Sequence, residues 1–199
     1  MTTTNLILDP ERIESTSFEI IDSEVGPHPY DALQWPVVWR IIHTPADFDF
    51  ARTTFFSEGA VERGISALRG GRSVLCDTNM VLSGVSKPRL ASFGCDIRCH
   101  VADSDVADEA RREGVTRSIV ATRKGGAAGC GIYLIGNAPT ALFELLRLVR
   151  EEGVEPALVV GVPVGFVGAQ ESKEALIASG LPCIVARGRK GGSAIAATV

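Results

Sequence analysis

Apolar residues recur along this chain in two arrangements, as short continuous runs and as longer stretches at helical spacing. The short runs predict strands buried on both faces, because such strands need apolar side chains on each side. The stretches between them predict helices of about ten to fifteen residues. We expect five strands, at residues 73–76, within 95–101, and at 131–136, 156–162 and 182–186.

This alternation predicts a three-layer α/β/α fold, in which helices cover both faces of a flavodoxin-like parallel sheet of about five strands. No repeat or linker divides the chain, so residues 1–199 are expected to form one domain, with residues 1–8 as a loose tail. Two helices before the sheet form an N-terminal helical extension, the first from Asp9-Pro10 to about Val25.

The second helix of this extension carries the candidate for chemistry. Asp31 is its expected N-cap, and Pro45 should end it close to His43, because proline disfavours helical geometry in the residue before it. Spacing at i, i+3, i+4 and i+7 predicts one buried face made of Trp35, Val38, Trp39 and Ile42.

The expected position of His43 has a chemical consequence. The negative end of a helix dipole favours imidazolium, which suits His43 to donate a proton and take it back near neutral pH. Arg40 lies three residues earlier, on the same side, where it could hold an anionic group beside the ring. A histidine at a helix end is nevertheless more often a surface or core residue than a catalyst.

Composition narrows the class of function. The net charge of −4, with no basic run interleaved with aromatic residues, argues against nucleic-acid binding. No stretch approaches the length of a membrane span and no secretory signal pattern begins the chain, so we expect a cytoplasmic protein without membrane association. The five cysteines are odd in number and scattered, which favours reduced thiols over a zinc site.

The carboxyl ends of the predicted strands are the expected ligand-binding edge. Free backbone N–H groups where helices begin after these strands, for example at residues 137–139, are ready sites for anions. Basic residues spread over turns and helix starts would together suit a ligand with several carboxylates. The glycines of residues 161–168 keep a nucleotide-binding enzyme as an alternative interpretation, although neither a P-loop nor a dinucleotide fingerprint occurs.

Seven motifs stand along residues 14–199: Arg40-x-x-His43-x-x-x-Asp47-Phe48, Asp77-x-Asn79-Met80-Val81-x-x-Gly84, Thr116-Arg117-Ser118, Ile135-Gly136-Asn137-Ala138-Pro139-Thr140-Ala141-Leu142, Gly161-x-Pro163-Val164-Gly165-Phe166-Val167, Glu171-Ser172-Lys173 and Gly188-Arg189-Lys190-Gly191-Gly192-Ser193. Through these motifs the chain resembles the precorrin-8X methylmutase family of cobalamin (vitamin B12) biosynthesis.

The resemblance implies an isomerase that moves a methyl group from C-11 to C-12 of precorrin-8X, or of cobalt-precorrin-8, to give hydrogenobyrinic acid or its cobalt-containing counterpart. It implies a homodimer with the active site at the subunit interface, and no cofactor or protein-bound metal. The family's catalytic histidine falls on His43. Its substrate contacts fall on Ser17 and Arg40, with Arg117 as a further candidate.

The residues agree with this chemistry, because a methyl shift around a conjugated macrocycle needs neither a nucleophile nor a redox group. Protonation by His43 would make the macrocycle electron-poor and ease the migration. Two other interpretations stay open. One is a non-catalytic tetrapyrrole-binding or channelling protein, and the other is the nucleotide-binding enzyme.

Overall fold

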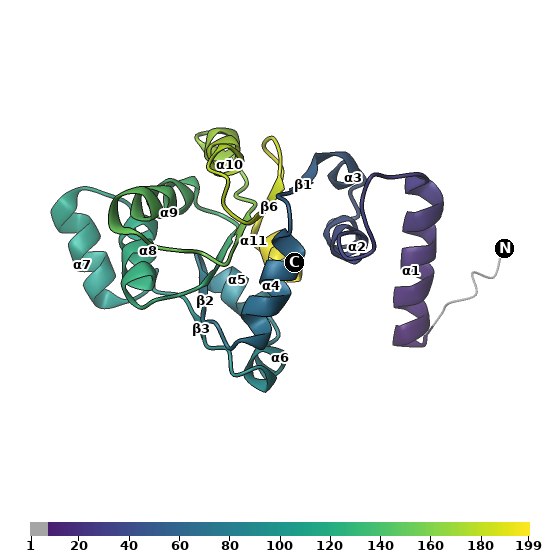
Figure 1. Cartoon of the computed structure of the whole chain (residues 1–199), viewed down its shortest axis with the longest axis horizontal. Coiled ribbons are helices and arrows are strands. Elements are labelled where there is room, and N and C mark those ends of the chain that lie inside the picture. Colours follow the sequence, from purple (N-terminus) through teal and green to yellow (C-terminus); the bar gives the residue numbers. More distant parts are fainter. Residues whose placement is uncertain (1–7) are drawn as a thin grey trace.

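The computed structural model describes residues 8–199 and contains one six-stranded sheet (Figure 1). The strand order is β1-β6-β5-β4-β2-β3. All neighbours run parallel except β1, which pairs with β6 in the antiparallel direction. The strands are β1 (Thr54–Phe56), β2 (Val74–Cys76), β3 (Ile97–Arg98), β4 (Ile132–Ile135), β5 (Leu158–Gly161) and β6 (Cys183–Ala186).

The five parallel strands coincide with the five predicted runs. Numbered among themselves along the chain, they lie in the order 2-1-3-4-5, which is the flavodoxin-like order. The predicted α/β/α fold is therefore confirmed. The sixth strand, β1, was not predicted because three residues at a sheet edge give too short a pattern.

Alternate residues of each strand point into two separate cores, as the period of two requires. In β4, Ile132 and Leu134 join one core, and Tyr133 and Ile135 join the other. The first core lies under α4 (Ala60–Arg69), α5 (Asn79–Gly84) and α11 (Ser193–Thr198), and the second under α8 (Arg117–Ala127), α9 (Pro139–Glu152) and α10 (Ala169–Ala178).

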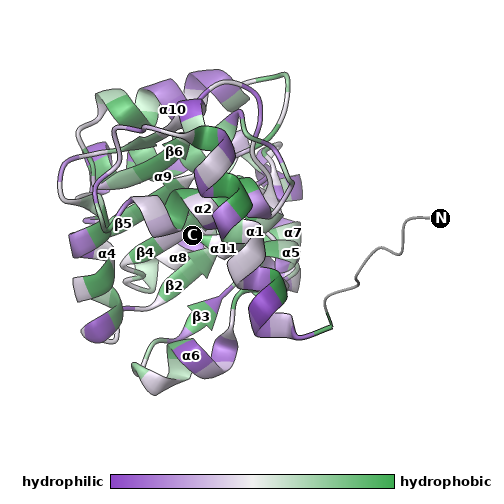
Figure 2. Ribbon diagram, turned by 90° about the vertical axis from the view of Figure 1, so that its right-hand side faces the viewer, coloured by the Kyte–Doolittle hydropathy of each residue, from purple (hydrophilic) through white to green (hydrophobic). Residues whose placement is uncertain are grey.

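The remaining helices lie at the ends of these layers. Figure 1 shows α7 (Ser104–Glu113) at one end of the molecule, packed on α8, and α1 (Pro10–Val25) at the other. Between α1 and the sheet lies α2 (Trp35–His43), which packs against both α1 and α11 (Figure 2). The short helices α3 (Phe50–Thr53) and α6 (Lys87–Ser92) complete the chain.

The N-terminal helical extension is thus present, with one correction to its details. Asp31 does not cap α2, which begins after Gln34 without a side-chain cap. Asp31 instead accepts the backbone N–H groups of Leu33 and Gln34, at 2.8 and 2.9 Å, and stabilises the turn that leads into the helix. The predicted loose tail lies, except for its last residue, outside the described residues.

Within residues 8–199, no helix is both long and apolar enough to cross a membrane. All five cysteines are free, and four of them are buried. Burial raises the pKa of the Cys76 thiol to about 12, so that cysteine behaves as a small hydrophobic residue.

Candidate active site

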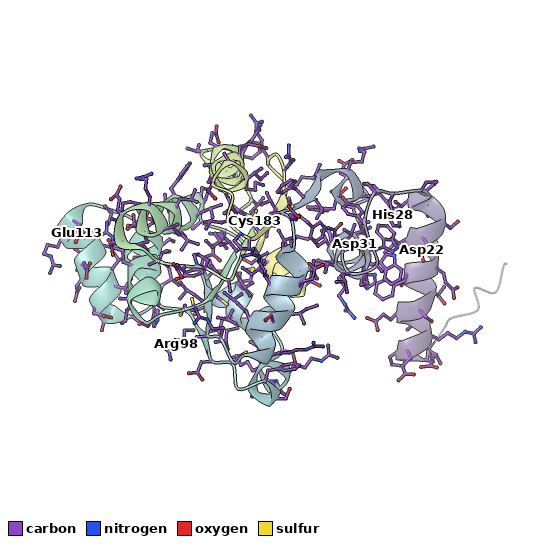
Figure 3. The ribbon with its side chains drawn as sticks, viewed as in Figure 1. Asp22, His28, Asp31, Arg98, Glu113 and Cys183 are labelled. Atoms are coloured by element: carbon purple, nitrogen blue, oxygen red, sulfur yellow. The ribbon has the colours of Figure 1, made fainter. Side chains whose placement is uncertain are left out.

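An aromatic stack joins α1 to α2. The rings of Phe18 and Trp39 lie parallel, with centroids 5.2 Å apart. The indole N–H groups of Trp35 and Trp39 both donate to one carboxylate oxygen of Asp22, at 2.9 and 2.7 Å. Figure 3 shows Asp22 on α1, facing α2. These contacts fix α1 against the helix that carries His43.

Two of the predicted site residues, His43 and Arg40, lie around the Phe18 ring. The His43 ring is exposed and meets Phe18 edge-on, at 5.6 Å between centroids. The Arg40 guanidinium lies 5.8 Å from the Phe18 centroid. The structure therefore brings Arg40 and His43 together around one aromatic platform. Phe18 belongs to none of the sequence motifs, and its place directly after Ser17 was the available clue.

Arg40 is paired with Glu14 of α1 at 3.2 Å, and both side chains are about half exposed. Exposed ion pairs of this kind contribute little to stability, because solvent screens them. Arg40 can therefore exchange Glu14 for the carboxylate of a ligand at low cost.

Ser17 is half-buried on α1, and its hydroxyl donates to the carbonyl of Ile13 at 2.7 Å. This bond leaves the lone pairs of the Ser17 oxygen as acceptors. The described residues contain no hydrogen bond from Ser17 to α2, so Ser17 is joined to His43 only through the packing of α1 on α2.

The chain turns sharply after His43. Ala46 has a φ of 53°, and it is the single non-glycine with positive φ within residues 8–199. Its N–H donates to the His43 carbonyl at 3.3 Å, and the N–H of Asp47 donates to Ile42 at 3.2 Å. This pair of bonds resembles a Schellman turn, in which glycine is the usual residue. Left-handed geometry costs a residue such as alanine roughly 1–2 kcal/mol.

The loop between β6 and α11 ties this turn to the carboxyl edge of the sheet. The ammonium group of Lys190 donates to Asp47 at 2.6 Å and to Asp49 at 2.7 Å. The hydrogen bond from Lys190 holds the pKa of both carboxyl groups below the usual value. The end of α2 is therefore anchored to the expected ligand-binding edge.

A buried lysine of α10 also holds the loop between β6 and α11. Lys173 of α10 is fully buried, and its ammonium nitrogen lies 2.9 Å from the carbonyl oxygen of Lys190. Burial lowers the pKa of Lys173 to about 8. A buried amine that donates to one backbone carbonyl fixes the position of Lys190.

The neighbouring loop, between β5 and α10, exposes apolar side chains. Phe166 and Val167 are 83% and 90% exposed, and Val164 is 45% exposed. The Arg189 guanidinium lies 5.4 Å from the Phe166 ring centroid, and the Gly165 N–H donates to the Arg189 carbonyl at 3.2 Å. This edge offers apolar and cationic surface together, which suits a large apolar ligand with carboxylates or a protein surface.

The anion site expected at residues 137–139 is already filled by the protein itself. The buried carboxylate of Asp77, at the end of β2, accepts the N–H groups of Gly136, Asn137 and Ala138 at 3.1, 2.7 and 2.8 Å. Burial raises the pKa of Asp77, and these three bonds oppose that effect. The prediction of free N–H groups there was wrong, because a side chain 60 residues away in sequence occupies them.

Arg117 is not close to His43 within one chain. It is the exposed first residue of α8, whose N-cap Thr116 contacts Thr140 of α9 at 3.0 Å between hydroxyl oxygens. Figure 1 places α8 in the opposite half of the molecule from α2. Ser17, Arg40 and His43 therefore lie on the packed pair of helices α1 and α2, and Arg117 lies apart from them.

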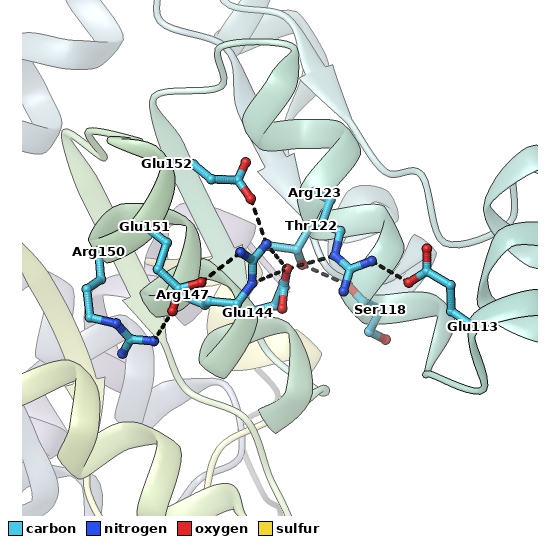
Figure 4. A network of polar contacts seen from close by, with 9 residues as sticks. All are labelled: Glu113, Ser118, Thr122, Arg123, Glu144, Arg147, Arg150, Glu151 and Glu152. Carbon is cyan, nitrogen blue, oxygen red and sulfur yellow. Dashed lines mark hydrogen bonds and ion pairs between the residues drawn. The ribbon is translucent and has the colours of Figure 1, made fainter.

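A second charged cluster, on α7, α8 and α9, has a structural role (Figure 4). Glu144 is nearly buried and accepts hydrogen bonds from Arg123 at 2.8 Å and Arg147 at 2.6 Å. Burial alone would raise the pKa of Glu144, but these bonds lower it below the usual value. Arg123 also bonds Glu113 at 2.6 Å. Because its charges pair with one another, this cluster joins helices and leaves no open site.

The part of the chain from residue 8 onward contains no group of three histidine, cysteine or acidic side chains placed to hold a metal ion. The chemistry available at the candidate site is that of an exposed imidazole, guanidinium groups and aromatic surface.

Comparison with known proteins identifies relatives over most of the chain. Residues 12–199 match the family described as precorrin-8X methylmutase. Cobalt-precorrin-8 methylmutase of Priestia megaterium is 47% identical over 96% of this chain and 85% of its own. Precorrin-8X methylmutase of Pseudomonas aeruginosa is 41% identical over 96% of this chain and 93% of its own. A crystal structure of precorrin-8x methyl mutase from Thermus thermophilus superposes with a TM-score of 0.85 at 41% identity, covering 94% and 92% of the two chains.

Proposed function

This chain belongs to the precorrin-8X methylmutase family, and we propose that His43 is the proton donor of its reaction, on a tetrapyrrole bound between the two subunits of a homodimer. The chain is an isomerase of cobalamin biosynthesis. One observation carries the proposal for His43: its ring is exposed beside Arg40 and Phe18 at the end of a helix anchored to the ligand-binding edge.

In the proposed reaction, the imidazolium of His43 protonates the macrocycle of precorrin-8X or cobalt-precorrin-8. The electron-poor ring then undergoes a sigmatropic shift, in which the bond from the methyl carbon to C-11 breaks as the bond to C-12 forms. The proton returns to His43, so no oxidant or reductant is consumed. A positioned acid of this kind accelerates a reaction by roughly 10²–10⁴-fold.

Arg40 and Ser17 are the proposed anchors for the substrate. Arg40 would release its exposed partner Glu14 and bind a peripheral carboxylate of the macrocycle in a charge-assisted bond. Ser17, one residue before Phe18, would offer its oxygen as an acceptor. Holding the macrocycle in one orientation beside His43 supplies the proximity that the proton transfer needs.

The homodimer is proposed from the separation of the predicted site residues. Arg117 begins α8, in the opposite half of the molecule from α2, so a site that uses both Arg117 and His43 needs two subunits. The exposed Phe166 and Val167, at the same sheet edge as the end of α2, favour a surface that a partner covers. We further propose that residues 1–199 act as one domain and that the reaction takes place in the cytoplasm.

Mixing two inactive variants tests this arrangement. If each site combines His43 of one subunit with Arg117 of the other, random exchange of His43→Ala and Arg117→Ala subunits gives heterodimers in which one site holds both substitutions and the other holds neither. If His43 acts with Arg117 of the partner subunit, the mixture should regain about a quarter of the wild-type rate. The rate of conversion of precorrin-8X or cobalt-precorrin-8 is followed by visible absorbance.

The two variants measured alone under the same conditions are the controls. A mixture that stays as inactive as its components, with subunit exchange verified by mass spectrometry, would show that one subunit supplies both residues. Full activity of Arg117→Ala alone would remove Arg117 from the site.

A further inference from the structure

A three-residue ion cluster stands beside the end of the His43 helix and has no role in the reaction described above. Lys190 donates to Asp47 and Asp49, which lie 143 and 141 residues away in sequence. We refer to Lys190, Asp47 and Asp49 as the Lys190 clasp. The antiparallel pair of β1 and β6, extended by the bond from the Arg187 N–H to the Thr53 carbonyl at 2.8 Å, brings the loop between β6 and α11 near the segment that follows α2. The clasp adds a side-chain link between them closer to His43.

The clasp closes on a strained turn. Asp47 follows Ala46, whose left-handed backbone an alanine rarely adopts. The Ala46 N–H bonds the His43 carbonyl, and the Asp47 N–H bonds the Ile42 carbonyl. Asp47 also accepts the N–H of Asp49 at 3.0 Å. Strained backbone persists where surrounding contacts determine it, and here those contacts meet at Asp47.

The other side of the clasp is held rigidly. The buried Lys173 donates to the carbonyl of Lys190 at 2.9 Å, from a helix packed against the sheet. The Gly192 N–H donates to the carbonyl of Val162 at 2.9 Å, which ties the same loop to the end of β5. The sheet therefore provides a fixed support, and the clasp transmits its position to the turn after His43.

We propose that the Lys190 clasp positions His43 for proton transfer, by holding the strained turn at Ala46 in place. This inference rests on the proposed role of His43 as proton donor. Lys190 and Asp47 are positioning residues in this account, because they act through the backbone of His43 and do not touch the reacting atoms.

Because the clasp is partly exposed to solvent, its effect on the reaction rate can be measured separately from its effect on stability. The side chains of Lys190, Asp47 and Asp49 are 50%, 29% and 43% exposed. Exposed ion pairs contribute little to folding, so loss of the clasp should leave the melting temperature almost unchanged. Proton transfer depends steeply on geometry, since a displacement of about 1 Å can cost up to 10²-fold in rate.

Steady-state kinetics of Lys190→Met test the proposal. We expect kcat to fall about tenfold while KM changes less than about twofold, and Lys190→Arg to restore most of kcat. The matched control is Arg111→Met, which breaks an exposed pair with Asp108 on α7 and should leave both constants unchanged. A rise in KM with unchanged kcat would overturn the proposal, since it would mean that Lys190 binds substrate directly.

A double-mutant cycle shows whether Lys190 acts through Asp47. Asp47→Asn should lower kcat like Lys190→Met, and the double variant should lose little more than either. Full additivity of the two losses would overturn the proposal. Protein NMR provides a measurement without substrate: the ring signals of His43 should shift in Lys190→Met and Asp47→Asn, and not in Arg111→Met.

The NMR result also separates this inference from the proposed function. If His43→Ala keeps full turnover, the proposed function fails whatever the clasp variants do. If His43→Ala is inactive, but the ring signals of His43 in Lys190→Met match those in the wild type, the clasp does not position His43. In that case only the role of the clasp is ruled out, and the proposed function stands.

Discussion

Replacing His43 with alanine should lower turnover of the tetrapyrrole by roughly 10²–10⁴-fold, the contribution expected of a positioned acid. Binding of the corrin product should weaken only a few-fold, because Arg40, Phe18 and Ser17 remain in place around the site. Single-turnover absorbance measures the first quantity, and titration of the protein with product measures the second.

His43→Gln is the sharper companion to this variant. Glutamine keeps an N–H donor and a similar length but has no transferable proton near neutral pH. Since His43 is exposed, neither substitution should change the melting temperature appreciably. Wild-type turnover in either variant would remove His43 from the mechanism. Tight product binding with no turnover by the wild-type protein itself would favour a carrier of tetrapyrroles over an enzyme.

Replacing Asp77 with alanine should lower the free energy of unfolding by about 3 kcal/mol, because three backbone N–H groups, two of them buried, lose their acceptor. The substitution also removes a buried charge, which is itself unfavourable in the folded state. This gain offsets part of the stability lost with the three hydrogen bonds. The turn from β4 into α9 should also loosen, because the carboxylate is its principal restraint. Urea unfolding followed by circular dichroism measures the change.

Asp96→Ala is the matched control for Asp77. The Asp96 side chain is 72% exposed and pairs only with Arg98 within the described residues, so its loss should change the free energy of unfolding by less than about 0.5 kcal/mol. Equal effects of the two substitutions would mean that the N–H groups of residues 136–138 find another acceptor, such as water.

Four of the five parallel strands were predictable because each is a continuous apolar run between turn residues. The other, β3, lies in a stretch where apolar residues alternate with Asp96, Arg98 and His100. Helix ends were equally clear where caps mark them, as at Asp9 and Val25 around α1. The strand β1 and the short helices α3, α5 and α6 were missed, since segments of three to six residues show no period. Their structure is set by tertiary packing.

The site residues likewise divide into those that local sequence patterns could predict and those that only the fold brings together. His43 and Arg40 could be chosen as candidates from their places on a predicted helix and from one motif. The capture of residues 136–138 by Asp77 could not be predicted, because it joins segments some 60 residues apart. The clasp between Lys190 and Asp47 spans 143 residues, and only the fold brings its ends together. Local patterns report local structure, and these contacts are set by the order of the strands.

A crystal structure of the dimer with the corrin product bound would show whether His43 meets the macrocycle where the methyl group migrates. We predict that a ring nitrogen of His43 lies within hydrogen-bonding distance, about 3 Å, of the macrocycle near the migrated methyl group. Arg40 should contact a peripheral carboxylate of the same macrocycle. Product bound with His43 turned away from it, or at a surface that does not include α2, would contradict the proposed mechanism.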